Sequence, residues 1–490
     1  MSVIALLEKI KSRDKKIISD KKMALNGGDF YQKVCTASSK LKALGITEGV
    51  PVLVNLNNDI ASVINLFAAW KLQAAVFVGN PFNPIDGVTN TIAKFKLYAV
   101  LGNKSTVKAL HSLLVGSADE NQAEPQCHFS DGLAALVLQN NLHNVNTTQQ
   151  LERHAGIAIF SSGSTGEPKA ILNSFDSILE NALSHADAIG LKETDVVGCI
   201  LPIFYSYGLV ANLLSAIAVG AKVALQNAKA GAEESWMREN RVSVIALTPF
   251  FAKDLIITSP HLRVITIGGD ALHARTAKKI KKNHPNCELY STFGLTEAGP
   301  RVATWRFDNC ENFPEHRVVP LGEPLSCCEV ELDGHGQLIV NTNTKMIGYY
   351  NGYSLGVTIP NWAENTVETG DLFEEINGNY FFVGRDKDII VQNGEKIFPA
   401  LVEMVLLGMD EVEDARVIGL SDPDKGEVAE VFIKAKSELC KDKVRRFLLS
   451  HLPHASMPTN FHMVKNISRT ATGKKSSITQ FRQQIQKQSA

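Results

Sequence analysis

The chain has 490 residues, too many for one compact hydrophobic core, so we expect two or three domains. Hydrophobic residues make up 44% and charged residues 21% of the chain, as in an ordinary soluble globular enzyme. The formal net charge of −1 gives no indication of a nucleic acid or a membrane surface as a partner.

Apolar runs typical of strands alternate with helical patterns over the first 380 residues. The predicted helices cover residues 1–9 and 60–72, and the predicted strands cover 51–56, 74–78, 154–160, 242–247 and 262–267. The longest apolar region, residues 208–225, is interrupted by polar residues and fits a buried helix followed by a strand better than a membrane span. This alternation favours parallel sheets covered by helices, with ligands at the carboxyl ends of the strands.

The pattern changes near residue 317 to short strands and turns, which predicts a small β-rich subdomain. Charges and turn residues at 384–388 mark a candidate domain boundary, and a compact α+β segment follows it. Residues 441–490 contain ten lysines and arginines but only one acidic residue, Asp442. The local net charge is therefore +9. This basic end either faces phosphates or an acidic partner or forms a solvated surface.

Eight cysteines are scattered along the chain without a C-x-x-C motif, and two of them, Cys327 and Cys328, are adjacent. Adjacent cysteines have poor geometry for an ordinary disulfide, so the sequence predicts a reduced, cytoplasmic protein. The histidine pair at 451 and 454 has Pro453 between its members, which argues against a helical metal site. The N-terminus has no basic start before its apolar run, so we expect a helix there and not a signal peptide.

The most informative segment is 161–169, Ser-Ser-Gly-Ser-Thr-Gly-Glu-Pro-Lys. Its glycines permit a sharp turn close to an anion, its backbone amides can form a nest for oxyanions, and its hydroxyls and lysine add donors and charge. The segment lacks the G-x-x-x-x-G-K-[ST] spacing of the Walker loop, so it predicts a different kind of phosphate loop. A flexible surface loop is the structural alternative.

Five motifs occur in order at 161–169, 290–297, 368–371, 384–388 and 469–474. Together they resemble the adenylate-forming superfamily of acyl- and aryl-CoA synthetases, stand-alone adenylation domains and firefly luciferases, and the resemblance covers nearly the whole chain. It implies an α/β fold with a large N-terminal domain, residues 1–384, made of two parallel-sheet subdomains and a small β-barrel-like subdomain. A small, mobile α+β C-terminal domain, residues 385–490, would follow it.

The resemblance implies that the enzyme activates a carboxylic acid with ATP and Mg²⁺ to an acyl-adenylate, releases pyrophosphate and passes the acyl group to a thiol. The acceptor would be coenzyme A or the phosphopantetheine of an acyl or peptidyl carrier protein. Because an anionic carboxylate attacks an anionic phosphate, donors and a metal must neutralise the developing charge. The expected partners are therefore a small carboxylic acid and a thiol carrier, with no nucleic acid and no membrane span.

The second motif carries several of the implied roles. Phe293 corresponds to the aromatic residue that packs on adenine, beside Gly294, and a core aromatic is its structural alternative. Thr296 would contact the α-phosphate, and Glu297 would be a catalytic group that holds Mg²⁺. The loop residues that would grip the β- and γ-phosphates are Ser161, Ser162, Gly163, Ser164, Thr165, Gly166 and Lys169, with Thr165 also catalytic.

The ribose of ATP would be held by Asp371 and Arg385, because a carboxylate can accept from both ribose hydroxyls. An interdomain ion pair is the structural alternative for Arg385. Gly269 and Asp270 resemble the segment that lines both the adenine site and the acyl pocket.

Lys474 resembles the family lysine that bridges the attacking carboxylate and the α-phosphate, so it is the strongest candidate for catalysis. Its neighbour Lys475 has no such match and is expected to be solvated. Lys387 falls at the hinge position, where the small domain would rotate between the two half-reactions. Gly394 matches the glycine beside the pantetheine tunnel.

The acid-binding motif at 201–209 departs from the family, because Tyr205 stands where many acyl-activating members have histidine. Ser206 stands near the position of the aspartate that holds an α-amino group, so an acyl or aryl acid is favoured over an amino acid. Tyr205, Ser206 and Gly208 are the predicted acid-binding residues. Since Asp270 could supply the missing charge, a stand-alone amino-acid adenylating enzyme remains the alternative, and a scaffold that binds ATP without catalysis is a third hypothesis.

Overall fold

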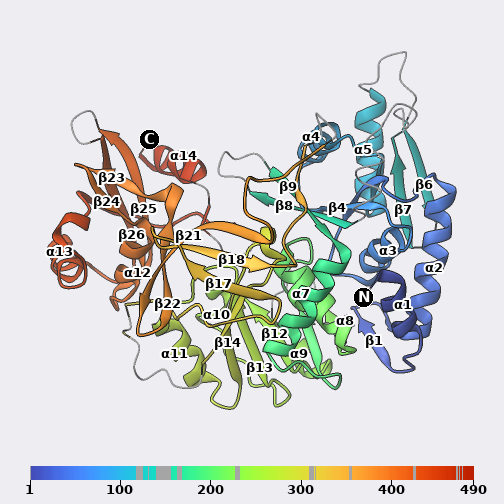
Figure 1. The fold of residues 1–490 in the computed structure, drawn as a ribbon, viewed down its shortest axis with the longest axis horizontal. Helices are drawn as coiled ribbons and strands as arrows, with labels where there is room; N and C mark the ends of the chain where they lie inside the picture. The colour runs from blue at the N-terminus through green and yellow to red at the C-terminus, as the bar shows by residue number, and fades with distance from the viewer. Residues whose placement is uncertain are drawn as a thin grey trace.

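The computed structural model describes residues 2–116, 125–130, 132–138, 156–162, 168–226, 232–307, 314, 316–351, 356–422, 426–470, 473, 475–476 and 478–489. Two nine-stranded sheets form the large N-terminal part, and a smaller α+β unit follows it, drawn in orange and red in Figure 1. No helix in these ranges is long and apolar enough to cross a membrane.

The first sheet has the strand order β20-β19-β9-β8-β4-β3-β5-β7-β6. Strands β3, β4, β5 and β8 are parallel, whereas the strands outside them pair antiparallel. The bounds are β3 (Pro51–Asn55), β4 (Ala75–Gly79), β5 (Ala99–Leu101), β6 (Gln126–Ser130), β7 (Leu133–Val137), β8 (Gly156–Ser162), β9 (Pro168–Ser174), β19 (Gly348–Asn351) and β20 (Gly356–Thr358). The central strands β3 and β4 are mainly apolar because both faces of the sheet are covered, and the buried polar residue Asn55 ends β3.

The second sheet has the order β16-β15-β14-β13-β12-β10-β11-β1-β2, parallel from β14 to β1 and antiparallel at both edges. The bounds are β1 (Lys16–Ser19), β2 (Ala24–Asn26), β10 (Val196–Cys199), β11 (Lys222–Leu225), β12 (Val244–Leu247), β13 (Val264–Gly268), β14 (Glu288–Phe293), β15 (Ala303–Arg306) and β16 (Glu323–Pro324). The predicted α/β fold is confirmed, and both sheets are mixed where parallel sheets were expected.

The largest buried cluster lies between the inner faces of the two sheets and is filled mainly by helices. Trp70 and Phe175, with ring centroids 5.1 Å apart, join two of these helices. The helices of the N-terminal part are α1 (Val3–Lys11), α2 (Gly27–Ala43), α3 (Ile60–Lys71), α4 (Ile85–Phe95), α5 (Lys104–Gly116), α7 (Phe175–Ala188), the π-helix η2 (Tyr207–Leu214), α8 (Ser215–Val219), α9 (Glu234–Glu239), α10 (Pro249–Ala252), α11 (Ala274–Asn283) and the 3₁₀-helix η3 (Thr296–Ala298). Asp59 begins α3 as its N-cap, because its carboxylate accepts from the backbone N–H of Ser62 at 2.8 Å.

The predicted β-rich subdomain is a four-stranded antiparallel sheet. Its strands are β17 (Cys328–Leu332), β18 (Gln337–Thr342), β21 (Thr366–Ile376) and β22 (Asn379–Arg385), and in the described part of the chain their order is linear and not closed. The predicted boundary between residues 384 and 385 falls one residue before the end of β22, and the 3₁₀-helix η5 (Asp386–Asp388) follows. The boundary itself stays a prediction.

The last part of the chain forms a second α+β unit around its own core. Its elements are β23 (Ile390–Gln392), β24 (Glu395–Ile397), α12 (Pro399–Leu407), β25 (Val412–Asp422), β26 (Gly426–Ala435), α13 (Lys441–Leu449), η6 (His454–Ser456), β27 (Asn460–Met463) and α14 (Ile478–Ser489). The unit contacts the N-terminal part at α11, where Arg275 pairs with Asp410 at 2.7 Å. His273, just before α11, bonds the carbonyl of Met404 through Nε2 at 2.9 Å.

The structure corrects one expectation about the basic end and shows a second ion pair there. Lys475 was expected to be solvated, which is wrong, because its ammonium is largely buried and pairs with Glu403 of α12. Arg469 likewise pairs with Asp414 at 2.6 Å. Part of the positive charge of residues 441–490 therefore neutralises acids of the same unit.

Candidate active site

The predicted phosphate loop connects two antiparallel strands. Ser161, at the end of β8, lies opposite Lys169 on β9, and Ser162 lies opposite Pro168. The strands thus bring the two ends of the loop together. The intervening residues Gly163, Ser164, Thr165 and Gly166 lie outside the described part of the chain.

A chain of contacts links this loop to the second motif. Strand β19 pairs with β9, so Tyr349 stands beside the loop, and the ammonium of Lys169 lies 5.0 Å from the centre of its ring. The Tyr349 hydroxyl donates to Glu297 Oε1 at 3.2 Å. The backbone N–H of Met346 also donates to the Glu297 carbonyl at 2.8 Å, which fixes the glutamate against the β19 segment.

Tyr349 is a site residue that sequence reasoning missed, because no motif or spacing marks it. Burial, and then the negative charge of Glu297, raise the pKa of the Tyr349 phenol above its usual value. The phenol therefore stays protonated at neutral pH and remains a donor to Glu297.

The second motif also meets the predicted acid-binding motif. Thr296 Oγ1 donates to Ser206 Oγ at 3.2 Å, so the start of η3 touches the segment that begins η2. Gly208 lies where an added Cβ would stand 2.3 Å from the carbonyl oxygen of Pro202, so this close turn requires glycine. π-Helices such as η2 occur frequently at functional sites.

Tyr205 is half-buried and packs on Phe204, with ring centroids 4.5 Å apart. Burial raises the pKa of the Tyr205 phenol, which is therefore neutral at physiological pH. At this position the chain offers an aromatic face and one neutral hydroxyl, where a histidine would offer a titratable ring.

The predicted ribose-binding pair is assembled by direct strand pairing. Asp371 on β21 lies opposite Arg385 on β22, and Arg385 Nε is 2.8 Å from Asp371 Oδ1. Asp371 is only 4% exposed, so burial raises the pKa of its carboxyl, while Arg385 acts in the opposite direction. Asp371 in turn raises the pKa of Arg385, and the charges of Asp388 and Asp270 add to this effect.

Phe293 connects the ribose-binding pair to the second motif. Its ring lies edge-on to Phe373 on β21, with centroids 5.6 Å apart. Phe293 is only partly buried, so it borders the core of the β-rich sheet without being enclosed by it.

Gly269 follows β13 with a φ of 83°, a left-handed conformation that favours glycine.

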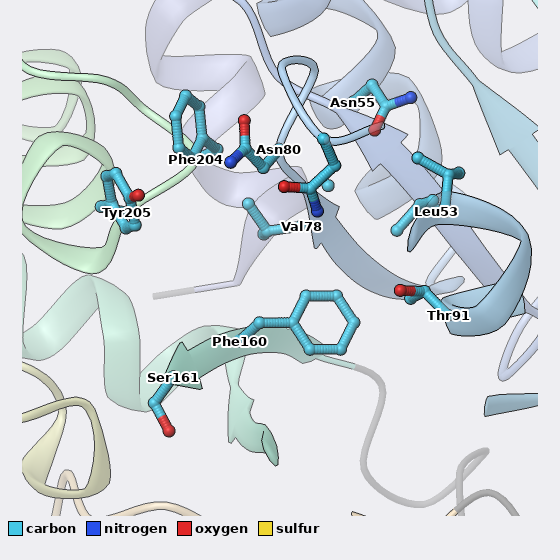
Figure 2. A pocket seen from close by; sticks show the side chains of 12 residues that line it. Leu53, Asn55, Val78, Asn80, Thr91, Phe160, Ser161, Phe204 and Tyr205 are labelled. Atoms are coloured by element: carbon cyan, nitrogen blue, oxygen red, sulfur yellow. The ribbon is translucent and has the colours of Figure 1, made fainter. Parts of the chain in front are cut away.

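A cavity of about 240 Å³ opens between the phosphate loop and the acid-binding motif. Figure 2 shows Phe204 and Tyr205 on one side of it and Leu53 and Thr91 on the other. It is lined by Leu53, Asn55, Val78, Gly79, Asn80, Asn83, Val88, Thr91, Phe160, Ser161, Phe204 and Tyr205. Asn55 is 3% exposed, and both polar atoms of its amide lack a hydrogen-bond partner in the described structure.

Gly473, the residue before Lys474, is held by two contacts, and Lys474 itself lies outside the described residues. Arg469 Nη1 donates to the carbonyl of Gly473 at 2.6 Å, and its guanidinium stacks 4.7 Å above the Phe250 ring. An added Cβ on Gly473 would meet that ring at 2.7 Å. Because α10, which carries Phe250, follows β12, this segment lies at the carboxyl end of the second sheet.

Two predicted residues do not join the site in this structure. Gly394 forms the exposed tip of the β23–β24 hairpin together with Asn393, with φ values of 80° and 52°, and has no atoms within reach of an added Cβ. Lys387 lies in η5, and its positive charge partly offsets the rise that burial causes in the pKa of Asp371.

The sequence matches known proteins along most of its length. The family sequence model of AMP-binding enzymes matches residues 9–350. The family model of the AMP-binding enzyme C-terminal domain matches residues 401–474. A 2-succinylbenzoate–CoA ligase of Bacillus pumilus is 26% identical over 475 residues, which cover 94% of this chain and 92% of that protein. A Staphylococcus aureus 2-succinylbenzoate–CoA ligase is 25% identical over 471 residues, 91% of this chain and 93% of that protein.

Solved structures agree in fold. The anthranilate CoA ligase AuaEII, in complex with anthranoyl-AMP, superposes with a TM-score of 0.78 at 18% identity and covers 100% of this chain and 97% of its own. The o-succinylbenzoate CoA synthetase of Bacillus subtilis, with its acyl-adenylate, gives 0.74 at 19% identity, with coverages of 97% and 96%. The chain therefore belongs to the AMP-binding enzyme family. Within it, the class is that of AMP-forming ligases that join an acid to a thiol.

Proposed function

We propose that the enzyme activates a small acyl or aryl carboxylic acid with ATP, releases pyrophosphate and transfers the acyl group to coenzyme A. The observation that carries the proposal is the continuous set of contacts from Lys169 through Tyr349 to Glu297, and from Thr296 to Ser206. It joins a phosphate loop, a carboxylate and an acid-binding motif in one place. The relatives named above, which are CoA ligases, support coenzyme A as the acceptor.

The residues divide the substrates between them in this proposal. The 161–169 loop holds the phosphates that leave, Thr296 bonds the α-phosphate, and the pair of Asp371 and Arg385 holds the ribose. Phe293 packs on the adenine beside Gly294, with Gly269 and Asp270 along its edge. Lys474 brings a positive charge to the attacking carboxylate and the α-phosphate.

Glu297 is suited to a magnesium ion. Mg²⁺ is usually held by one or two carboxylates together with phosphate oxygens and water, so one glutamate beside a phosphate loop is a sufficient protein contribution. In the described ranges no group of three or more His, Cys, Asp or Glu residues forms a separate metal site. When bound, the ion would neutralise charge on the phosphates, and Glu297, fixed by Tyr349, would hold it.

The acid is acyl or aryl and not an α-amino acid. Ser206 supplies a neutral hydroxyl where an ammonium would need a carboxylate. Asp270, the acid that could compensate, is exposed and accepts from the N–H of Ala271 at 2.9 Å. ATP–pyrophosphate exchange over benzoate, anthranilate, 2-succinylbenzoate, fatty acids and amino acids tests this choice. Exchange stimulated only by an amino acid would contradict it and favour a stand-alone amino-acid adenylating enzyme that loads a carrier protein.

The cavity beside Tyr205 is suited to the pantetheine arm of the acceptor. Its walls are largely apolar, but the amides of Asn55, Asn80 and Asn83 also line it. Pantetheine is a narrow chain with two amide groups, so it can bond an asparagine amide that otherwise has no partner. The coenzyme and a carrier protein share this arm, so the cavity alone does not separate these acceptors.

Replacing Asn55 by leucine should therefore raise the KM for coenzyme A about tenfold while leaving acid-dependent pyrophosphate exchange unchanged. Leucine has a similar volume and removes an unpartnered polar group, so stability should be maintained or increased. Steady-state kinetics with varied coenzyme A measure the effect, and Asn283→Leu, at an exposed position at the end of α11 and outside the cavity lining, is the comparison. A raised KM for the acid instead would assign the cavity to the acid.

The second half-reaction should depend on rotation near Lys387. Proline at this position fixes φ and restricts Asp386, so Lys387→Pro should slow thiol transfer from supplied acyl-adenylate about tenfold and affect adenylation less. Single-turnover assays of the two half-reactions measure this, with Lys387→Ala as the control. A selective loss of adenylation would move the hinge elsewhere.

A further inference from the structure

Arg301 is a buried cation without a counterion. The residue follows η3 and is 3% exposed, and none of the ion pairs in the described ranges includes its side chain. Its Nη1 donates to Thr292 Oγ1 at 3.1 Å, and its Nε donates to the carbonyl of Pro300 at 3.0 Å. Burial lowers the pKa of Arg301 to about 10, so the guanidinium remains charged at neutral pH.

The position of this guanidinium is fixed from several sides. Asn181 of α7 bonds both the backbone N–H and the carbonyl of Arg301, at 2.8 Å and 2.7 Å. The guanidinium carbon lies 4.5 Å from the ring centre of Tyr207, whose hydroxyl lies 3.0 Å from Thr266 Oγ1. Arg301 is thus held by hydrogen bonds to its backbone and by stacking on Tyr207. None of these contacts supplies a negative charge opposite the guanidinium.

A second buried polar group lies near it without a partner. His185, one turn after Asn181 on α7, is 1% exposed, and neither ring nitrogen has a hydrogen-bond partner in the described structure. Burial, and then the charge of Arg301, lower the pKa of His185 to about 3, so its ring is neutral and keeps one N–H donor. Unpartnered buried groups of this kind are rare and call for an explanation.

Arg301 also lies where the acid-binding motif meets the second motif. Tyr207 stands between Ser206 and Gly208, and Thr292 precedes Phe293. An added Cβ on Gly294 would lie 3.0 Å from Arg301 Cζ, so the guanidinium packs closely against that glycine. The cation therefore borders the acid-binding motif, through Tyr207, and the segment proposed to hold the adenine, through Thr292 and Gly294.

We propose that Arg301 binds a second anionic group of the acid, so that the preferred substrates are dicarboxylic acids or acids with an equivalent anionic substituent. This inference rests on the proposed acid-activating function. Burying a charge is costly unless an opposite charge and hydrogen bonds compensate, and a carboxylate matches the planar guanidinium in both respects. The carboxyl group that reacts at the α-phosphate and the group held by Arg301 are then the two ends of one substrate.

Paired adenylate analogues test this binding directly. The probes are the sulfamoyl-adenosine derivatives of succinate, glutarate and homophthalate, each with a free distal carboxylate, and the methyl ester of each. By titration calorimetry the wild type should bind at least one charged probe about 100-fold more tightly than its ester. Arg301→Gln should reduce this ratio to about threefold or less, whereas Arg301→Lys should keep part of it, because lysine retains the charge but not the planar fork.

Arg306→Gln is the matched control, because Arg306 is on β15 but is exposed and lies 3.6 Å from Glu288. It should keep the wild-type ratio, and unchanged AMP binding should show that each variant folds. Equal affinities of the wild type for charged and neutral probes would overturn the proposal and leave Arg301 as a structural partner of Tyr207. So would an Arg301→Gln enzyme that folds and keeps the preference.

The two proposals fail differently. If the wild type prefers a charged probe but shows no pyrophosphate exchange with any acid, the anion site stands and the proposed function is contradicted. If exchange is strong with monocarboxylic acids and no charged probe is preferred, the function stands and the role of Arg301 is contradicted.

Discussion

Replacing Lys474 by alanine is expected to lower ATP–pyrophosphate exchange about 1,000-fold, the size of effect seen when a donor to a developing negative charge is removed. The reason is electrostatic, because the carboxylate and the α-phosphate repel each other until a positive charge lies between them. The described neighbours favour this role: Gly473 packs on Phe250 at the carboxyl end of the second sheet, and Arg469 bonds Gly473.

Thiol transfer from a supplied acyl-adenylate should be nearly unchanged in the same variant, because that step needs no new bond to phosphorus. Rapid-quench assays of each half-reaction measure the difference. Lys465→Ala, an exposed lysine of the same unit, is the control and should behave as the wild type. Equal loss in both half-reactions would contradict the role proposed for Lys474.

Replacing Glu297 by glutamine is expected to lower exchange about 100-fold and to raise the magnesium concentration required. Glutamine keeps the size of the side chain and an oxygen that can accept from Tyr349, so the fold should not change. Only the charge that would hold the ion is lost. Exchange rates over a series of Mg²⁺ concentrations measure the effect.

Glu323→Gln, at an exposed position on β16, is the control for Glu297→Gln. It should keep the wild-type magnesium dependence. If Glu297→Gln also keeps it, the metal is held elsewhere, and Glu297 would serve only to position Tyr349.

The main elements could be predicted because their cause is local. Strands β3, β4, β12 and β13 are covered on both faces, so each appears in the sequence as a mainly apolar run between turn residues. The predicted buried helix and strand at 208–225 correspond to η2, α8 and β11. Because these strands could be located in the sequence, the motifs that follow them could be placed at the strand ends.

The partners of the site residues could not be predicted, because distant segments create them. Tyr349 reaches Glu297 only because β19 pairs with β9, nearly 180 residues earlier in the chain. In the sequence, Arg301 is an ordinary arginine after a turn. Only the folded structure shows that α7 and η2 enclose it. Lys475 was expected to be solvated because it matches no residue of the family motif, and its partner, Glu403, lies on another element.

The acid-binding motif illustrates what a departure from a family pattern can and cannot indicate. Tyr205 in place of histidine removes a titratable group, which follows from the residue types alone. The sequence gives no indication that Tyr205 also forms a wall of a cavity with an unpartnered Asn55. That feature requires β3, β4 and β8 to end at the same edge of one sheet.

The most direct test of the central claim is product analysis by mass spectrometry with the purified protein, ATP, Mg²⁺, coenzyme A and the panel of carboxylic acids. We expect AMP and the matching acyl-CoA to form in equal amounts, only when a preferred acid is present. Bound ATP without AMP and acyl-CoA from any acid would contradict the account, as would acyl transfer confined to a carrier protein.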